Sequence, residues 1–252
     1  MAQLKIRTVN VPIVSSAECL KATRILECAR DSASSLLDAF EVMREKRARG
    51  GRPRGMTTDE EQDLLRAMLI MAAAGVDAMV KQLIRDSLPR LVGVDPEVRE
   101  GVEKFAARQI RGEAGGGIPE VHTGRDFMAR VLVAESQQSQ VIEEYIAELT
   151  SGSLQSPKEL ARTATALGIG QALLGPEMGI LRQIFDIRNA IVHGLDINLQ
   201  VDRRIRNVRK AGDMVRFTNA LLQVAERVRD SVDEKLRRAS PPSVRPTVPV
   251  TR

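Results

Sequence analysis

Apolar residues recur at helical intervals along most of this chain, and this periodicity limits the fold more than any other feature of the sequence. The longest apolar stripe runs from Leu65 to Ile84, and the capping box Thr58-Asp59-Glu60-Glu61 predicts where its helix begins. Another helix is predicted over residues 16–49, after a short β-compatible segment at 4–14. The pattern predicts an all-α chain, most economically one helical bundle with peripheral helices.

Start and stop signals predict five further helices. They run from Asp95-Pro96 to about Arg111, from Thr123 to about Thr150, from Ser156 to Gly168, from beyond Gly175-Pro176 to Gly194, and over about 211–238. Glycines at 112 and 115–117 predict a flexible hinge. The expected organisation is an N-terminal helical extension with a basic loop at 1–55, a helical domain at 56–239, and a disordered Pro- and Arg-containing tail at 240–252.

Composition narrows the functional classes. Of the 252 residues only 2% are aromatic, with no Trp, so the composition disfavours readers of single-stranded nucleic acid that stack bases on several aromatic rings. The net charge of +5 is unevenly placed, because residues 180–252 carry 15 Lys and Arg against 8 Asp and Glu. A polyanion would therefore bind in the C-terminal third. The basic stretch from Arg44 to Arg54 either contacts phosphate or is a solvated connector, and the connector is favoured.

Cysteine usage and hydropathy predict a soluble cytoplasmic protein with no membrane partner. Cys19 and Cys28 lie on opposite faces of one predicted helix, so they form neither a bridge nor a shared metal site, as suits a reducing compartment. No secretory signal is visible at the N-terminus. The longest apolar run, Ala67 to Val76, is too short to span a bilayer.

Most catalytic constellations are missing from the sequence. It has no Gly-x-Ser-x-Gly elbow, no His-Glu-x-x-His and no cysteine pairs at zinc spacing, so no metal or cofactor is expected. Acid–base chemistry through histidine must use His122 or His193, the only two histidines. His122 follows the glycine-rich hinge and has no partner nearby in the sequence, so it is interpreted as a loop histidine.

The predicted helix that ends at Gly194 carries two stripes. Ile180, Ile184, Ile187 and Ile191 form an apolar stripe, and Arg182, Asp186, Asn189 and His193 form a polar one beside it. The polar stripe is either a functional surface or a solvated face on which His193 interacts with the C-terminal end of the helix dipole.

Within this helix the order Arg188, Asn189, three residues and then His193 resembles the signature of HEPN domains, which are all-helical bundles and in many cases ribonucleases. The aliphatic pair before His193, the small residue after it and the nearby Asp196 extend the resemblance. It implies a HEPN-like domain that acts as a metal-independent endoribonuclease, as a toxin or antiphage effector restrained by an antitoxin or other regulatory protein. It also implies a homodimer whose two motifs share one cleft.

The chemistry of RNA cleavage is compatible with these residues. The 2′-hydroxyl of RNA is the nucleophile, His193 can move its proton, Arg188 can hold the phosphate, and Asn189 can bind the phosphate or orient His193. On an ideal helix Arg188 and His193 lie about 140° apart, so a two-fold partner would help to complete the site.

A downstream basic cluster, Arg203, Arg204, Arg206, Arg209 and Lys210, is predicted either to form an RNA-binding rim or to be a charged loop. Two other functions stay open. One is a non-catalytic HEPN-like module that binds RNA, nucleotide or a protein, and the other is a helical scaffold in which the motif is fortuitous.

Overall fold

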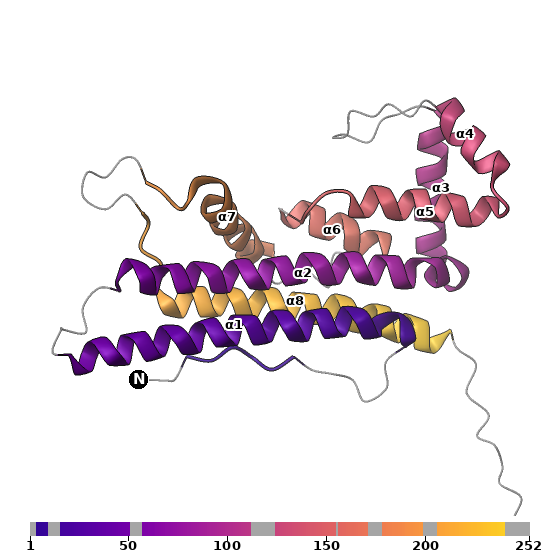
Figure 1. Ribbon diagram of the computed structural model, residues 1–252. Coiled ribbons are helices and arrows are strands. Elements are labelled where there is room, and N and C mark those ends of the chain that lie inside the picture. The colour runs from indigo at the N-terminus through magenta and orange to yellow at the C-terminus, as the bar shows by residue number, and fades with distance from the viewer. Residues whose placement is uncertain are drawn as a thin grey trace, which may run out of the picture.

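The computed structural model describes residues 4–9, 16–50, 57–111, 124–154, 156–170, 178–198 and 206–239. In these ranges the chain forms helices and no strand, which confirms the predicted all-α class (Figure 1). The helices are α1 (Ala17–Arg49), α2 (Asp59–Val94), α3 (Pro96–Ile110), α4 (Gly124–Val133), α5 (Gln137–Thr150), α6 (Pro157–Ala166), α7 (Met178–Gly194) and α8 (Ala211–Arg238).

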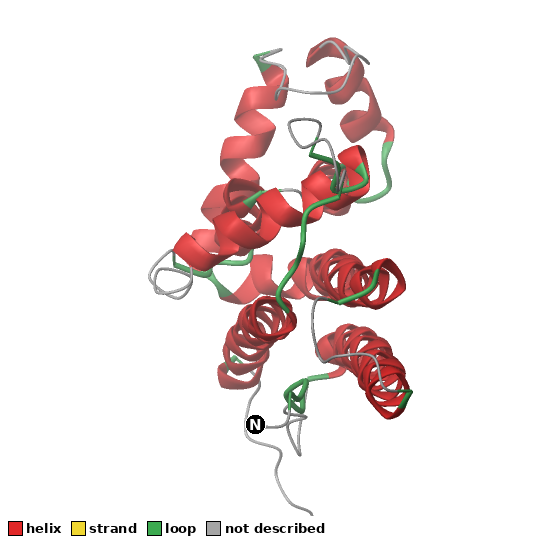
Figure 2. Ribbon diagram, turned by 90° about the vertical axis from the view of Figure 1, so that its left-hand side faces the viewer, coloured by secondary structure: helices red, strands yellow, loops and turns green. Residues whose placement is uncertain are grey.

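Three long helices, α1, α2 and α8, lie side by side, and α3 to α7 lie together on one side of them (Figures 1 and 2). Helix α2 is the centre of the fold because it packs against α1, α3, α5, α7 and α8. It approaches α1 closely at Gly75, where an added Cβ atom would stand 2.1 Å from the Cβ of Ala29. Only glycine allows the two backbones to come this close.

The capping box predicted for α2 is present. The Glu61 backbone N–H donates to Thr58 Oγ1 at 3.3 Å, and the Thr58 backbone N–H donates to Glu61 Oε2 at 3.0 Å. The helix continues past Pro89 to Val94, although the apolar stripe was expected to stop at this proline. Burial of Leu88, Leu91 and Val92 in the core offsets the hydrogen bond that the proline cannot make.

Two sequence predictions need correction. The helix expected over 123–150 is two helices, because Ser136 caps a new helix by accepting from the Ser139 backbone N–H at 3.3 Å. The basic stretch from Arg44 begins in the last turns of α1, which reaches Arg49, and not in a loop. Residues 51–56 lie outside the described ranges, as do the predicted hinge at 112–119 and the tail.

The N-terminal segment packs on the three long helices without forming a strand. Ile6 is buried in the core, and the Asn219 side chain of α8 accepts from the Arg7 backbone N–H at 2.8 Å and donates to the Lys5 carbonyl at 3.0 Å. Arg7 also pairs with the buried Glu226 at 2.6 Å. Residues of this segment and of α1 therefore belong to the same hydrophobic core as the remaining helices.

One helix, α2, is long and apolar enough to cross a membrane by length and composition alone. Half of its most apolar 18-residue window is buried in the bundle, and a single helix of this kind is weak evidence for a membrane span.

Candidate functional site

Helix α7 presents the two stripes expected from the sequence. Ile184 and Ile187 are buried, and Ile180 and Ile191 pack against the core from its edge. On the polar stripe Arg182, Asp186 and His193 are exposed and Asn189 is half-buried. The apolar stripe fixes α7 against α2 and α8, and the polar stripe faces outward.

The three motif residues lie on the last two turns of α7. Because the helix stays regular through Gly194, Asn189 and His193 are one turn apart on the same face. Arg188 is half-buried and donates from Nη1 to Asn189 Oδ1 at 2.9 Å. This bond draws the guanidinium around the helix towards the face that carries His193. Arg188 and Asn189 thus meet in one chain, whereas no described contact joins either of them to His193.

A tight turn follows the motif. Leu195 and Asp196 have φ values of 51° and 58°, in the left-handed region that costs a residue with a side chain about 1–2 kcal/mol. The Asp196 backbone N–H donates to the Ala190 carbonyl at 2.8 Å, and the Ile197 N–H donates to the Gly194 carbonyl at 3.0 Å. These bonds satisfy carbonyls at the end of α7, as in other left-handed helix caps.

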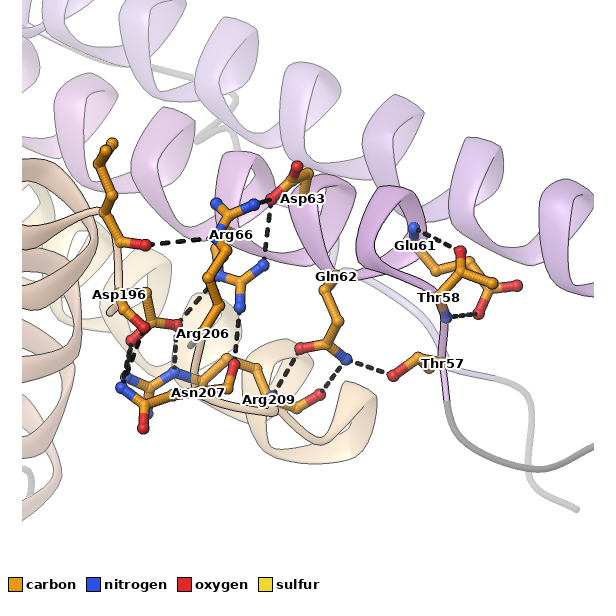
Figure 3. Close-up of polar contacts among 11 residues, drawn as sticks. Thr57, Thr58, Glu61, Gln62, Asp63, Arg66, Asp196, Arg206, Asn207 and Arg209 are labelled. Atoms are coloured by element: carbon orange, nitrogen blue, oxygen red, sulfur yellow. Dashed lines mark hydrogen bonds and ion pairs between the residues drawn. The ribbon is translucent and has the colours of Figure 1, made fainter. Parts of the chain in front are cut away.

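The buried carboxylate of Asp196 holds this turn in place (Figure 3). It accepts from Arg66 Nε at 3.0 Å, from Arg209 Nε at 2.9 Å and from Asn207 Nδ2 at 3.0 Å. Burial opposes ionisation, but the hydrogen bonds from Arg209, Asn207 and Arg66 outweigh it and hold the pKa of Asp196 below its ordinary value. We call Asp196 and these three partners the Asp196 network.

The first turns of α2 tie the Asp196 network to the chain that enters α8. Gln62 accepts from the Arg209 backbone N–H at 2.6 Å and donates to the Arg209 carbonyl at 2.9 Å. Arg66 donates to the Asn207 carbonyl at 2.6 Å, and Arg206 pairs with Asp63 at 2.7 Å. Burial raises the pKa of Asp63, but the hydrogen bonds and charges of Arg206 and Arg66 lower it by more. The pKa of Asp63 therefore lies below its ordinary value. The turn after His193 is therefore held by residues of α2 and by the chain that enters α8.

The residues of the predicted basic rim have different surroundings in the structure. Arg203 and Arg204 lie outside the described residues. Arg209 is committed to Asp196 through its side chain and to Gln62 through its backbone, so it acts as a structural residue rather than as part of an open rim. Arg206 is partly exposed and pairs with Asp63, and Lys210 is exposed at the start of α8.

Sequence reasoning missed Gln62, Arg66 and Asn207 as supports of the site. One signal was present for Arg66, because a charged residue that follows Leu65 inside the apolar stripe of α2 needs a buried partner. Nothing in the sequence identifies that partner as Asp196, which is 130 positions away.

The basic end of α1 joins the same end of the bundle. Arg47 binds Glu61 with two hydrogen bonds, at 2.9 and 3.1 Å, immediately beside the α2 residues that hold the Asp196 network. His122 lies outside the described residues. Within the part of the chain that the structure describes, no group of three or more His, Cys, Asp or Glu is placed to hold a metal.

Comparison of the chain with protein-family models, with curated proteins and with solved structures finds no match in any of the three. The function must therefore be argued from the residues and geometry above.

Proposed function

We propose that this chain is a metal-independent endoribonuclease of the HEPN type that acts in the cytoplasm. The observation that carries the proposal is the exposed His193 one helical turn from Asn189, with the Arg188 guanidinium hydrogen-bonded to that asparagine. An imidazole that can act as a general base and a forked phosphate donor are the minimum that cleavage through the 2′-hydroxyl requires.

In the proposed reaction His193 removes the proton of the 2′-hydroxyl, whose oxygen attacks the adjacent phosphorus. The bond from phosphorus to the 5′-oxygen breaks, that oxygen takes a proton from water, and the protonated His193 returns its proton to the solvent. The products are a 2′,3′-cyclic phosphate and a 5′-hydroxyl. Arg188 neutralises the phosphate oxygens as charge develops on them, and Asn189 orients the guanidinium. Nothing in this sequence of bond changes consumes a metal or cofactor.

A single chain leaves the motif open to solvent, which supports a composite site in a homodimer. Val192, Leu195 and Ile197 flank His193 in the sequence and are 43%, 64% and 41% exposed. Clustered exposed apolar residues of this kind mark interaction surfaces. A second copy placed there would cover them and bring a second Arg188 towards His193. Lys210 and Arg206 would then border the shared cleft and meet the RNA backbone.

A free ribonuclease would damage the RNA of its own cell. We therefore place the protein among toxins or antiphage effectors, with an antitoxin or other regulatory protein as its restraint.

One observation favours a second candidate, a non-catalytic module that binds RNA, nucleotide or a protein. The side-chain amide oxygen of Asn189 already occupies one donor of Arg188, and no described contact orients His193. Such an arrangement suits binding through Arg188 without proton transfer.

The test compares wild type with His193→Ala and Arg188→Ala, and uses Asp186→Ala as a control at an exposed position of the same helix. Loss of the general base is expected to reduce the cleavage rate about 10²- to 10⁴-fold, and the control should cleave like wild type. Folded wild type that leaves RNA as intact as both motif variants do would refute the nuclease. Loss of cleavage in EDTA would refute the metal-independent mechanism, and sedimentation of wild type as a monomer would refute the composite site.

A further inference from the structure

The outward face of α2 carries an apolar stripe that its own chain leaves uncovered. Ala67, Met71, Ala74 and Ala78 recur at intervals of four, three and four residues, the spacing of a coiled-coil seam. Ala74 and Ala78 are exposed and Met71 is 44% exposed. We call these four residues the outer stripe. Ala67, the first of the four, is half-buried.

Helix α1 forms a wall beside the outer stripe. A groove of about 320 Å³ runs between the two helices, bordered by Cys28 and Ser32 of α1 and by Met71 and Ala74 of α2. It is shallow because Gly75 lets α1 and α2 approach closely at this level. In Figure 1 both helices lie in front of α8, so α1 and α2 together form one face of the bundle.

The charges at the ends of the outer stripe have opposite sign. Glu60 lies seven residues before Ala67, and Arg85 lies seven residues after Ala78. Both side chains are exposed, and neither has an ion-pair partner among the described residues. Reversing the helix about the midpoint of Met71 and Ala74 therefore places Glu60 opposite Arg85, Ala67 opposite Ala78, and Met71 opposite Ala74. An antiparallel pair of such helices matches alanine with alanine at the Ala67–Ala78 pairs, places the longer Met71 against the small Ala74, and sets acid against base at both ends.

Helix α1 repeats this polarity. It runs antiparallel to α2, with Ala29 at the level of Gly75. The exposed Asp38 consequently lies towards the Glu60 end of the face and the exposed Arg24 towards the Arg85 end. The same two-fold rotation brings these two opposite charges of the two copies towards each other.

We propose that this face binds a second copy of the chain, with the two α2 helices antiparallel across a two-fold axis near Met71 and Ala74. The occupant is a second copy because the face is complementary to itself in charge and in residue size. No residue of α7 belongs to the face, so this contact is separate from the proposed catalytic dimer and does not depend on the nuclease activity. A chain that makes both contacts assembles beyond a dimer.

The first test is a disulfide across the axis. In a Cys28→Ser background, Met71→Cys with Ala74→Cys places each new thiol opposite its counterpart in the partner. Mild oxidation should give a covalent dimer on a non-reducing gel. The matched control is Glu100→Cys with Glu103→Cys, an exposed pair of the same spacing on α3, which should stay monomeric on that gel. A yield no higher than that of the control would overturn the proposal.

The second test exchanges the end charges. Glu60→Arg and Arg85→Glu should each weaken association about tenfold in sedimentation, because each exposes two symmetry-related pairs to like-charge repulsion. The two substitutions combined should restore it, and His193→Ala should leave it unchanged. A double variant as weak as the single ones would overturn the antiparallel arrangement. Flotation of the protein with phosphatidylcholine vesicles would also overturn the proposal, because the outer stripe would then contact lipid.

Discussion

Removal of the Asp196 carboxylate is the sharpest test of how the end of α7 is held. In Asp196→Ala the buried Arg66 loses an acceptor at 3.0 Å and Arg209 loses one at 2.9 Å. Breaking a buried pair by removing one partner costs about 3–5 kcal/mol. Arg66 keeps Asp63 Oδ1 at 3.0 Å and the Asn207 carbonyl at 2.6 Å, and Arg209 is near enough to the surface to gain water. The lower end of the range, about 3 kcal/mol, is therefore expected.

The assay is unfolding by heat and by urea, followed by circular dichroism at pH 7. For a chain of this length a loss of about 3 kcal/mol lowers Tm by about 6–12 °C. Asp186→Ala removes an exposed carboxylate from the same segment and should change the unfolding free energy by less than about 0.5 kcal/mol.

The pH dependence of the unfolding free energy distinguishes loss of the Asp196 charge from loss of side-chain packing. The folded-state pKa of Asp196 lies below its ordinary value, so its contribution to stability is complete above the unfolded pKa of about 3.9. That contribution is lost as the pH falls through the folded-state pKa. The difference in unfolding free energy between wild type and Asp196→Ala should therefore narrow below about pH 4. A difference of the same size at pH 7 and pH 3 would refute the ionic account and leave only a packing defect.

Three further predictions test the packing and the thiols. Gly75→Ala should destabilise the fold by about 1–3 kcal/mol, because the added Cβ would stand 2.1 Å from a facing α1 side chain. Gly93→Ala adds a Cβ with no neighbour within 4 Å, so it should be neutral or stabilising in the same denaturation assay. Gly168→Ala should lower Tm, since Gly168 has a φ of +69° and an added Cβ would lie 2.6 Å from a lysine ammonium; an unchanged Tm would contradict this packing. In dilute protein at pH 8 a thiol reagent should modify the exposed Cys28 quickly and Cys19 only on unfolding, because burial raises the pKa of Cys19 to about 11; equal rates would be inconsistent with this burial.

Much of the helical architecture follows from short-range signals. The Thr58 capping box, the Asp95-Pro96 start and the stripes on α7 depend on residues within a few positions of one another, and the structure contains all three. The break between α4 and α5 was missed because Ser136 lies inside an otherwise continuous helical pattern. A serine there is compatible with a helix interior or a cap, and only packing selects between them.

The candidate site could be located from sequence but not built from it. The order Arg188, Asn189, His193 and its position at a helix end were readable, since spacing on a helix fixes which residues share a face. The role of Arg209 could not be predicted from the sequence. Its interpretation as a phosphate contact depended on its place in a basic cluster, whereas its actual partner is a buried carboxylate on the other side of a turn.

By itself the sequence determined the all-α class, most helix limits, and the placement of Arg188, Asn189 and His193 at the end of one helix. These properties depend on local hydrogen bonding and on the helical repeat, which act over a few residues. Only the tertiary structure decided that Arg66 and Arg209 converge on Asp196, that two left-handed residues follow the motif, and that the outer stripe of α2 stays uncovered. Those outcomes depend on which segments meet in space, and Arg66 and Asp196, at 130 positions apart, meet only because α2 and α7 pack together.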